Sequence, residues 1–204
     1  MAQTKVLADR IYSEEGIVAD IVRIAAANIL LALCAHIAIP LPWTPVPITG
    51  QTFGVLLVAV LLGARRGALT LGLYLLEGIA GLPVFQPYGL PGAARFVGPT
   101  AGFLLAYPAA AFFTGWLVER GASKAAPLLA GALLCGETVI FAGGCAWLAI
   151  AMHLGWNTAF HQGVLPFLPG EIIKLVLVVA AVRGVENESQ QAPVLTNLSG
   201  PPRL

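Results

Sequence analysis

The segment from residue 163 to residue 184 is apolar enough to lie in a lipid bilayer, yet it contains two ionisable residues, Glu171 and Lys174. A charged side chain at the centre of a membrane helix costs about 3 kcal/mol on insertion scales, so it normally faces a protein interior, a partner or a ligand. Because the two residues are three positions apart, their side chains share one face of a helix. The segment therefore predicts a membrane helix with one polar face.

The composition of the whole chain agrees with a membrane protein. Only 10% of the 204 residues are charged and 58% are hydrophobic, whereas soluble domains contain about 25% charged residues. The formal net charge of +1 argues against nucleic acid as a partner. The three cysteines lie within apolar runs and are interpreted as packing residues. The three histidines lack metal-ligand spacing, so neither a metal nor a cofactor is expected.

Six apolar stretches approach the length of about 20 residues that a helix needs to cross a bilayer. They fall near residues 18–39, 51–62, 66–79, 100–118, 125–153 and 164–182. The expected fold is therefore an all-α integral membrane protein, a six-transmembrane-helix bundle over residues 18–184. Because the second and third stretches are short, those helices are expected to tilt or to border a cavity. Residues 1–17 are expected to form a cytoplasmic N-terminal segment, and residues 185–204 a disordered cytoplasmic tail.

The basic residues predict the orientation of this bundle. An even number of spans places both termini on one side, and loops rich in Lys and Arg usually stay in the cytoplasm. The terminal side would contain Lys5, Arg10, Arg65, Arg66, Arg120, Lys124, Arg183 and Arg203. The loops on the opposite side contain only Arg95. Both termini are therefore expected to be cytoplasmic.

Two loops on the outer side are rich in proline and glycine. The first spans residues 40–51 and the second residues 81–99. Together they are interpreted as a cap over a cavity. The last helix is expected to begin at Pro169, because proline is favoured in the first turn of a helix. Glu171 and Lys174 would then lie in its first two turns, below this cap.

Three motifs in these regions resemble signatures of the BioY family, the biotin-specific substrate-binding (S) components of energy-coupling-factor (ECF) vitamin transporters. They are Pro45-Val-Pro-Ile-Thr-Gly-Gln-Thr-Phe53, Gly81-Leu-Pro-Val-Phe85 followed by Gly98-Pro-Thr-Ala-Gly-Phe103, and Leu165-Pro-Phe-Leu-Pro-Gly-Glu-Ile-Ile-Lys174. The resemblance extends over residues 18–184. The chain departs from the family pattern at Ala101, where glycine is usual, at Phe103, where tyrosine is usual, and at Glu171, where aspartate is usual.

The resemblance implies a high-affinity biotin-binding subunit of a bacterial or archaeal plasma membrane that captures biotin from outside for uptake. The chain has no Gly-x-x-x-x-Gly-Lys-Ser/Thr phosphate-binding loop, so it is not expected to be an enzyme. Energy would come from partner proteins, a transmembrane coupling subunit (EcfT- or BioN-like) and ATPase subunits (EcfA- or BioM-like). Membrane lipid is the other expected partner.

The resemblance also implies Glu171, Lys174 and Arg95 as contacts to biotin. A carboxylate can accept hydrogen bonds from the N–H groups of the cyclic urea, while the two cations can donate to the urea carbonyl or to the ligand carboxylate. Which cation faces which end of the ligand stays open. Further candidates are Gln51 and Thr49 for neutral hydrogen bonds, and Phe85, Tyr88, Phe103, Tyr107 and Phe167 for the apolar wall.

Each assignment has a structural alternative. Glu171 and Lys174 could form only a buried ion pair, Arg95 could anchor its loop to lipid headgroups, and the aromatic rings could serve packing alone. Small side chains let another helix approach closely, and Ala25, Ala26 and Ala27 match the surface that S components present to the coupling subunit. Packing within the chain is the alternative for these alanines.

The sequence also bears on two other classes of function. An intramembrane serine protease is disfavoured, because Ser13, Ser123, Ser189 and Ser199 all lie outside the apolar stretches. A channel or proton-coupled carrier would use Glu77, Glu137 and Glu171 as a relay. The first two of these acids are interpreted instead as protonated or hydrogen-bonded core residues, or as groups at the lipid interface.

Overall fold

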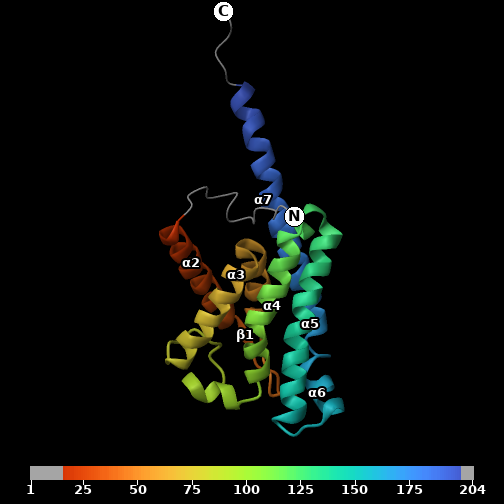
Figure 1. Cartoon of the computed structure of the whole chain (residues 1–204). Coiled ribbons are helices and arrows are strands. Elements are labelled where there is room, and N and C mark those ends of the chain that lie inside the picture. Colours follow the sequence, from red (N-terminus) through yellow and green to blue (C-terminus); the bar gives the residue numbers. More distant parts are fainter. Residues whose placement is uncertain (1–15, 199–204) are drawn as a thin grey trace, which may run out of the picture.

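The computed structural model describes residues 16–198 of the chain, with side chains described as far as Val185 (Figure 1). Its long helices are α2 (Ile17–His36), α3 (Gln51–Ile79), α4 (Ala101–Glu119), α5 (Ala126–Ile150) and α7 (Leu168–Leu198). The shorter elements are β1 (Ala38–Ile39), β2 (Ile48–Thr49), the 3-10 helices η1 (Gly92–Val97) and η2 (Ala122–Lys124), and α6 (Trp156–Gly163).

Helix α3 is a hairpin of two helical arms that meet at Gly63. This glycine has φ 79° and ψ −170°, a backbone conformation that interrupts the helix. The Nε2 of Gln51 donates to the hydroxyl of Tyr74 at 2.7 Å, although residues 23 positions apart would be separated by about 34 Å in a straight helix. A Cβ built on Gly67 would lie 3.4 Å from Ala59 Cα, which places the two arms in contact. The arms correspond to the two short stretches predicted from the sequence.

The first turn of the second arm is capped by α4. The backbone N–H of Ala64 donates to Oε1 of Glu119 at 2.8 Å. The first N–H groups of a helix have no partner within the helix, and a carboxylate at this end satisfies one of them and also interacts favourably with the helix dipole. The end of α4 therefore stabilises the turn at Gly63.

Among the described residues, four helices are long and apolar enough to cross a membrane, or up to five if the bent pair α6 and α7 is one span. The direction of the chain bends by 52° between α6 and α7. This count treats α3 as one span, so the predicted number of six is not confirmed by it. The coarser expectation is confirmed: the chain is a mostly helical bundle with several candidate membrane spans.

The end of the bundle formed by the proline-rich loops contains a small β-ribbon. Ala38 of β1 pairs with Thr49 of β2, and Ile39 pairs with Ile48, in antiparallel register. The expectation of an all-α chain therefore misses two short strands. The prolines between them exclude a helix and favour extended backbone on either side of the turn. Figure 1 shows this ribbon, η1 and α6 at one end of the bundle, and the start of α2 at the other end.

The C-terminal boundary also differs from the expectation. Helix α7 continues to Leu198, whereas the sequence analysis predicted a disordered tail from residue 185. Residues 186–192 read Glu-Asn-Glu-Ser-Gln-Gln-Ala, and the Glu, Gln and Ala among them have high helix propensity. Residues 1–15 and 199–204, on which most of the predicted terminal segments fall, lie outside the described residues.

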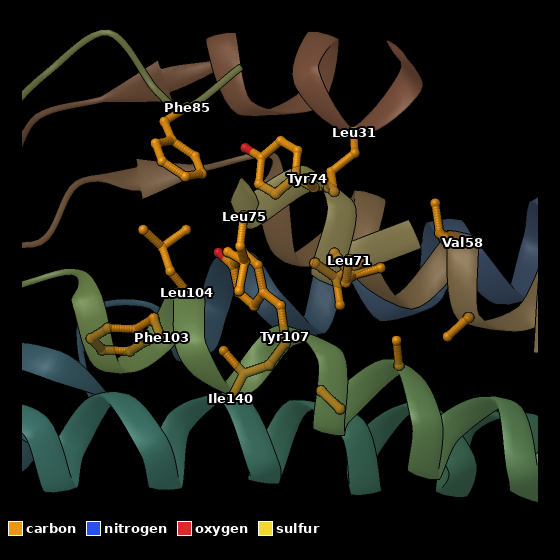
Figure 2. Close-up of a cluster of buried hydrophobic side chains, with 14 of the residues drawn as sticks. Leu31, Val58, Leu71, Tyr74, Leu75, Phe85, Phe103, Leu104, Tyr107 and Ile140 are labelled. Atoms are coloured by element: carbon orange, nitrogen blue, oxygen red, sulfur yellow. The ribbon is translucent and has the colours of Figure 1, made fainter. Parts of the chain in front are cut away.

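The core lies between α3, α4 and α5 and extends to the loop that follows α3. Figure 2 shows Tyr74, Phe85, Phe103 and Tyr107 gathered in this core, with Leu31 of α2 beside Tyr74. The rings of Tyr74 and Phe85 meet edge to face, with their centroids 5.2 Å apart. This aromatic cluster adjoins the cavity described next.

Candidate ligand-binding site

Glu171 and Lys174 form an ion pair in the first two turns of α7. Nζ of Lys174 donates to Oε1 of Glu171 at 2.6 Å, and Glu171 is only 5% exposed. The second carboxylate oxygen, Oε2, accepts from the hydroxyl of Thr52 at 2.7 Å. Nζ of Lys174 also donates to the backbone oxygen of Thr49 and to Oγ1 of Thr52, at 2.6 and 2.9 Å. The pair thus ties the start of α7 to the start of α3.

A second series of hydrogen bonds links the start of α3 to the loop that follows this helix. Gln51 donates to the hydroxyl of Tyr74, and this hydroxyl donates to the backbone oxygen of Val84 at 2.8 Å. The donors of Gln51 and Tyr74 in this series therefore both have an acceptor, as buried polar groups require. The Oε1 of Gln51 accepts from the hydroxyl of Thr49 at 3.4 Å.

Arg95 lies in η1 and is buried, with 6% of its surface exposed. Its Nη1 donates to the backbone oxygen of Tyr88, and its Nη2 donates to that of Gln86 at 2.9 Å. The guanidinium carbon lies 5.7 Å from the centre of the Phe85 ring. Burial lowers the pKa of Arg95 from its ordinary value, but a guanidinium remains charged in proteins. The Nε of Arg95 has no acceptor among the described residues.

One cavity brings most of the predicted contacts together. Among the residues that line it are Thr49, Gln51, Phe85, Arg95, Phe103, Tyr107, Phe167 and Glu171. It contains about 520 Å³ of space, part of it open to solvent. Glu171 of α7 and Arg95 of η1 therefore border the same space, and aromatic rings from α4, from the turn before α7 and from the loop after α3 line it as well.

Two predicted residues do not line this cavity. Lys174 lies behind the cavity wall, where it is hydrogen-bonded to the lining residues Glu171, Thr49 and Thr52. Tyr88 is 45% exposed and lines a neighbouring cavity nearer the proline-rich loops. The two cavities share Pro47, Gln86, Arg95 and Thr100.

Sequence reasoning missed Thr52, Gln86, Thr100 and Phe141 as lining residues. Thr52 and Thr100 lie within the quoted motifs, so their position was a usable signal. Gln86 directly follows a motif. Phe141 lies in the apolar interior of α5, where nothing in the sequence separates a residue that faces the cavity from one that packs.

The other residues considered in the sequence analysis lie away from this cavity. Ala25 and Ala26 are exposed on α2, whereas Ala27 is buried within the chain. Glu77 accepts a hydrogen bond from Nδ2 of Asn28 at 3.1 Å, which joins α3 to α2. Within the described residues, no group of three or more His, Cys, Asp or Glu side chains is placed to hold a metal ion.

The match to known families covers nearly the whole chain. The BioY family model matches residues 3–191. The chain belongs to the BioY family. A member named biotin transporter BioY, from Rhizobium etli, is 41% identical over 165 residues, which cover 78% of this chain and 86% of the relative. A second biotin transporter BioY, from Thermotoga maritima, is 39% identical over 148 residues, or 72% of this chain and 84% of that protein.

A solved structure agrees with this assignment. The crystal structure of the S-component for biotin from an ECF-type ABC transporter superposes with a TM-score of 0.76 at 26% sequence identity. The alignment covers 83% of this chain and 92% of that chain. Together with its several long apolar helices, membership of the BioY family makes the chain a multi-pass membrane protein.

Proposed function

We propose that this chain is a biotin-binding S component that captures biotin at the outer face of the plasma membrane for uptake by an ECF-type importer. The observation that carries the proposal is the shared cavity, which Glu171 borders from α7 and Arg95 borders from η1. Relatives named biotin transporter and the biotin S-component fold support the choice of ligand.

The cavity provides a complement for each part of biotin. Glu171 would accept from the N–H groups of the cyclic urea, and Lys174 behind it would neutralise the carboxylate and hold it in place. Arg95, whose Nε has no acceptor among the described residues, would bind the carboxylate at the end of the valerate tail. The rings of Phe85, Phe103 and Phe167 would enclose the thiophane ring.

The proposed topology has six membrane segments, in which the two arms of α3 count separately. Each arm is shorter than a typical bilayer crossing. The first arm is largely buried, whereas the second exposes Leu69 and Leu76 on one side. Both termini would then be cytoplasmic, and the proline-rich loops would face outward. The neighbouring cavity at Tyr88 would be the entrance for biotin.

Energy would come from separate proteins, because the chain has no phosphate-binding loop. We propose that α2 contacts the transmembrane coupling subunit through its exposed residues, including Ala25 and Ala26, and that ATPase subunits act through that subunit. Ala27, which is buried, would pack within the chain instead.

Equilibrium binding of labelled biotin to the detergent-purified chain tests the ligand. We expect saturable binding that excess riboflavin or thiamine does not displace, because neither vitamin pairs a cyclic urea with a carboxylate tail. A folded chain that does not bind biotin would contradict the proposal and favour a carrier of another kind.

Two substitutions test the site itself. We expect Glu171→Gln and Lys174→Ala to weaken biotin binding strongly, since each leaves a buried charge without its partner. Glu77→Gln is the matched control, because the amide oxygen can still accept from Asn28 and the residue does not line the cavity. Normal binding by both site variants would show that the site lies elsewhere, even if the chain binds biotin.

A further inference from the structure

Glu137 of α5 is a buried acid that the proposed contacts to biotin leave unused. The residue is 5% exposed. Neither of its carboxyl oxygens has a hydrogen-bond donor among the described residues. An ionised carboxylate without donors is strongly disfavoured at membrane depth. The Glu137 carboxyl is therefore stable in this position only if it is neutral or paired.

The carboxyl that shares its surroundings with Glu137 is that of Glu171. Both residues are 5% exposed and line one apolar cavity between α5, α6 and α7, and the Glu171 carboxyl acts on Glu137 electrostatically. Lys174 of α7 also acts on Glu137 electrostatically, and so does Tyr107 from α4. Glu171 also borders the candidate binding cavity.

Two carboxyl groups in contact repel each other when both are ionised, and they form a hydrogen bond when one holds a proton. The donors decide which group holds it. Glu171 accepts from Lys174 through Oε1 and from Thr52 through Oε2, and these bonds stabilise its ionised form. Within the described part of the chain Glu137 has no such donor, so the proton belongs on Glu137. The three side chains then carry no net charge.

We propose that Glu137 is a positioning residue of the biotin site that, as the protonated acid, donates a hydrogen bond to Glu171. The Glu171 carboxylate is then held by donors from three helices, Thr52 of α3, Glu137 of α5 and Lys174 of α7. Such support fixes a ligand-binding group before the ligand arrives, and so reduces the entropy lost on binding. The role in biotin binding rests on the proposed function, whereas the shared proton does not.

Infrared spectroscopy tests the shared proton without any ligand. We expect the purified chain at neutral pH to show the carbonyl band of a protonated carboxylic acid, which shifts in heavy water. Glu137→Gln should remove this band, and the control Glu77→Gln should leave it in place. A wild-type spectrum without the band, or a band that survives Glu137→Gln, would overturn the proposal.

Biotin binding as a function of pH tests the positioning role. Glutamine can still donate to Glu171, so Glu137→Gln should bind biotin more tightly than Glu137→Leu, which should lose about tenfold or more in affinity. The wild-type affinity should fall as the pH rises and Glu137 ionises and repels Glu171. The affinity of Glu137→Gln should fall less.

Identical pH profiles for wild type and Glu137→Gln, or wild-type affinity in Glu137→Leu, would refute the positioning role. Should the leucine variant fail to fold, the comparison of the glutamine variant with wild type still decides the question. If the unmodified chain binds no biotin while Glu137→Gln still removes the infrared band, the proposed function fails and the shared proton is supported.

Discussion

At the scale of single residues, the start of α7 matters because it brings a charged pair to a buried position where every polar atom has a partner. Glu171 and Lys174 bond to each other and to Thr49 and Thr52 of the β2–α3 junction. Thr52 is the residue that both charges share, since it donates to the carboxylate and accepts from the ammonium. It is therefore the most informative neutral side chain to change.

Thr52→Val keeps the shape of the side chain but removes both hydrogen bonds. Hydrogen bonds to charged groups are worth about 1.5–3 kcal/mol each, so we expect biotin affinity to fall at least tenfold, as measured by isothermal titration calorimetry. Thr52→Ser, which keeps the hydroxyl, should bind close to the wild-type level. Equal affinities for the valine and serine variants would mean that Thr52 does not organise Glu171.

Charged residues and motif residues were the part of the site that the sequence could reveal. Glu171 and Lys174 stand out because a charge within an apolar membrane helix is unfavourable unless a function requires it, whereas Arg95 was implied by the resemblance to the family. Phe141 could not be found in this way, because aromatic residues occur throughout the apolar helices and their direction depends on tertiary packing. The sequence leaves Glu137 as a core acid or a group at the lipid interface, because its place in one cavity with Glu171 depends on how α5 and α7 pack.

At the scale of secondary-structure elements, glycine determines how closely the helices approach. Gly63 turns the chain between the two arms of α3, and Gly115 of α4 packs against that turn. A Cβ built on Gly115 would overlap the backbone of Gly63 and Ala64. Because backbone cannot rotate away as a flexible side chain can, this contact requires glycine in α4.

Gly115→Ala should therefore destabilise the protein, by about 1–3 kcal/mol as is typical of overpacked cores. Gly131→Ala on α5 is the matched control, because a Cβ there meets nothing within 4 Å and alanine has the higher helix propensity. Thermal unfolding in detergent should show a lower Tm for the first variant and an unchanged or higher Tm for the second. Equal Tm values would show that α4 can move away from the turn.

The sequence could predict both arms of α3 because Arg65 and Arg66 interrupt the apolar run beside Gly63. It could not predict the β-ribbon, since strands of two residues carry no periodic signal. The continuation of α7 to Leu198 was missed because a polar composition is common to solvated helices and to disordered segments. The length and hydropathy of the apolar stretches therefore predict the membrane helices better than the connections between them.

At the scale of the whole molecule, the basic residues gather at one end of the bundle. Asp20 at the start of α2 pairs with Arg66 at 3.0 Å, so α2 begins beside the turn of α3. Nη1 of Arg183 donates to the backbone oxygen of Ser123 at 3.3 Å, which places this part of α7 beside η2. Figure 1 shows η1, which contains Arg95, at the opposite end. In the proposed orientation, which follows the positive-inside rule, the first end faces the cytoplasm.

Labelling of single introduced cysteines in intact cells tests this orientation together with the six-segment topology. Leu90→Cys, at a position that is 50% exposed in the outer loop, should react with a membrane-impermeant maleimide without permeabilisation. Arg65→Cys and Lys124→Cys should react only after permeabilisation, because both positions are exposed at the opposite end. The parent chain, with its three native cysteines, measures the background. If α3 were a single straight span, position 65 would lie within the bilayer and stay unlabelled under both conditions, whereas an inverted protein would exchange the two patterns.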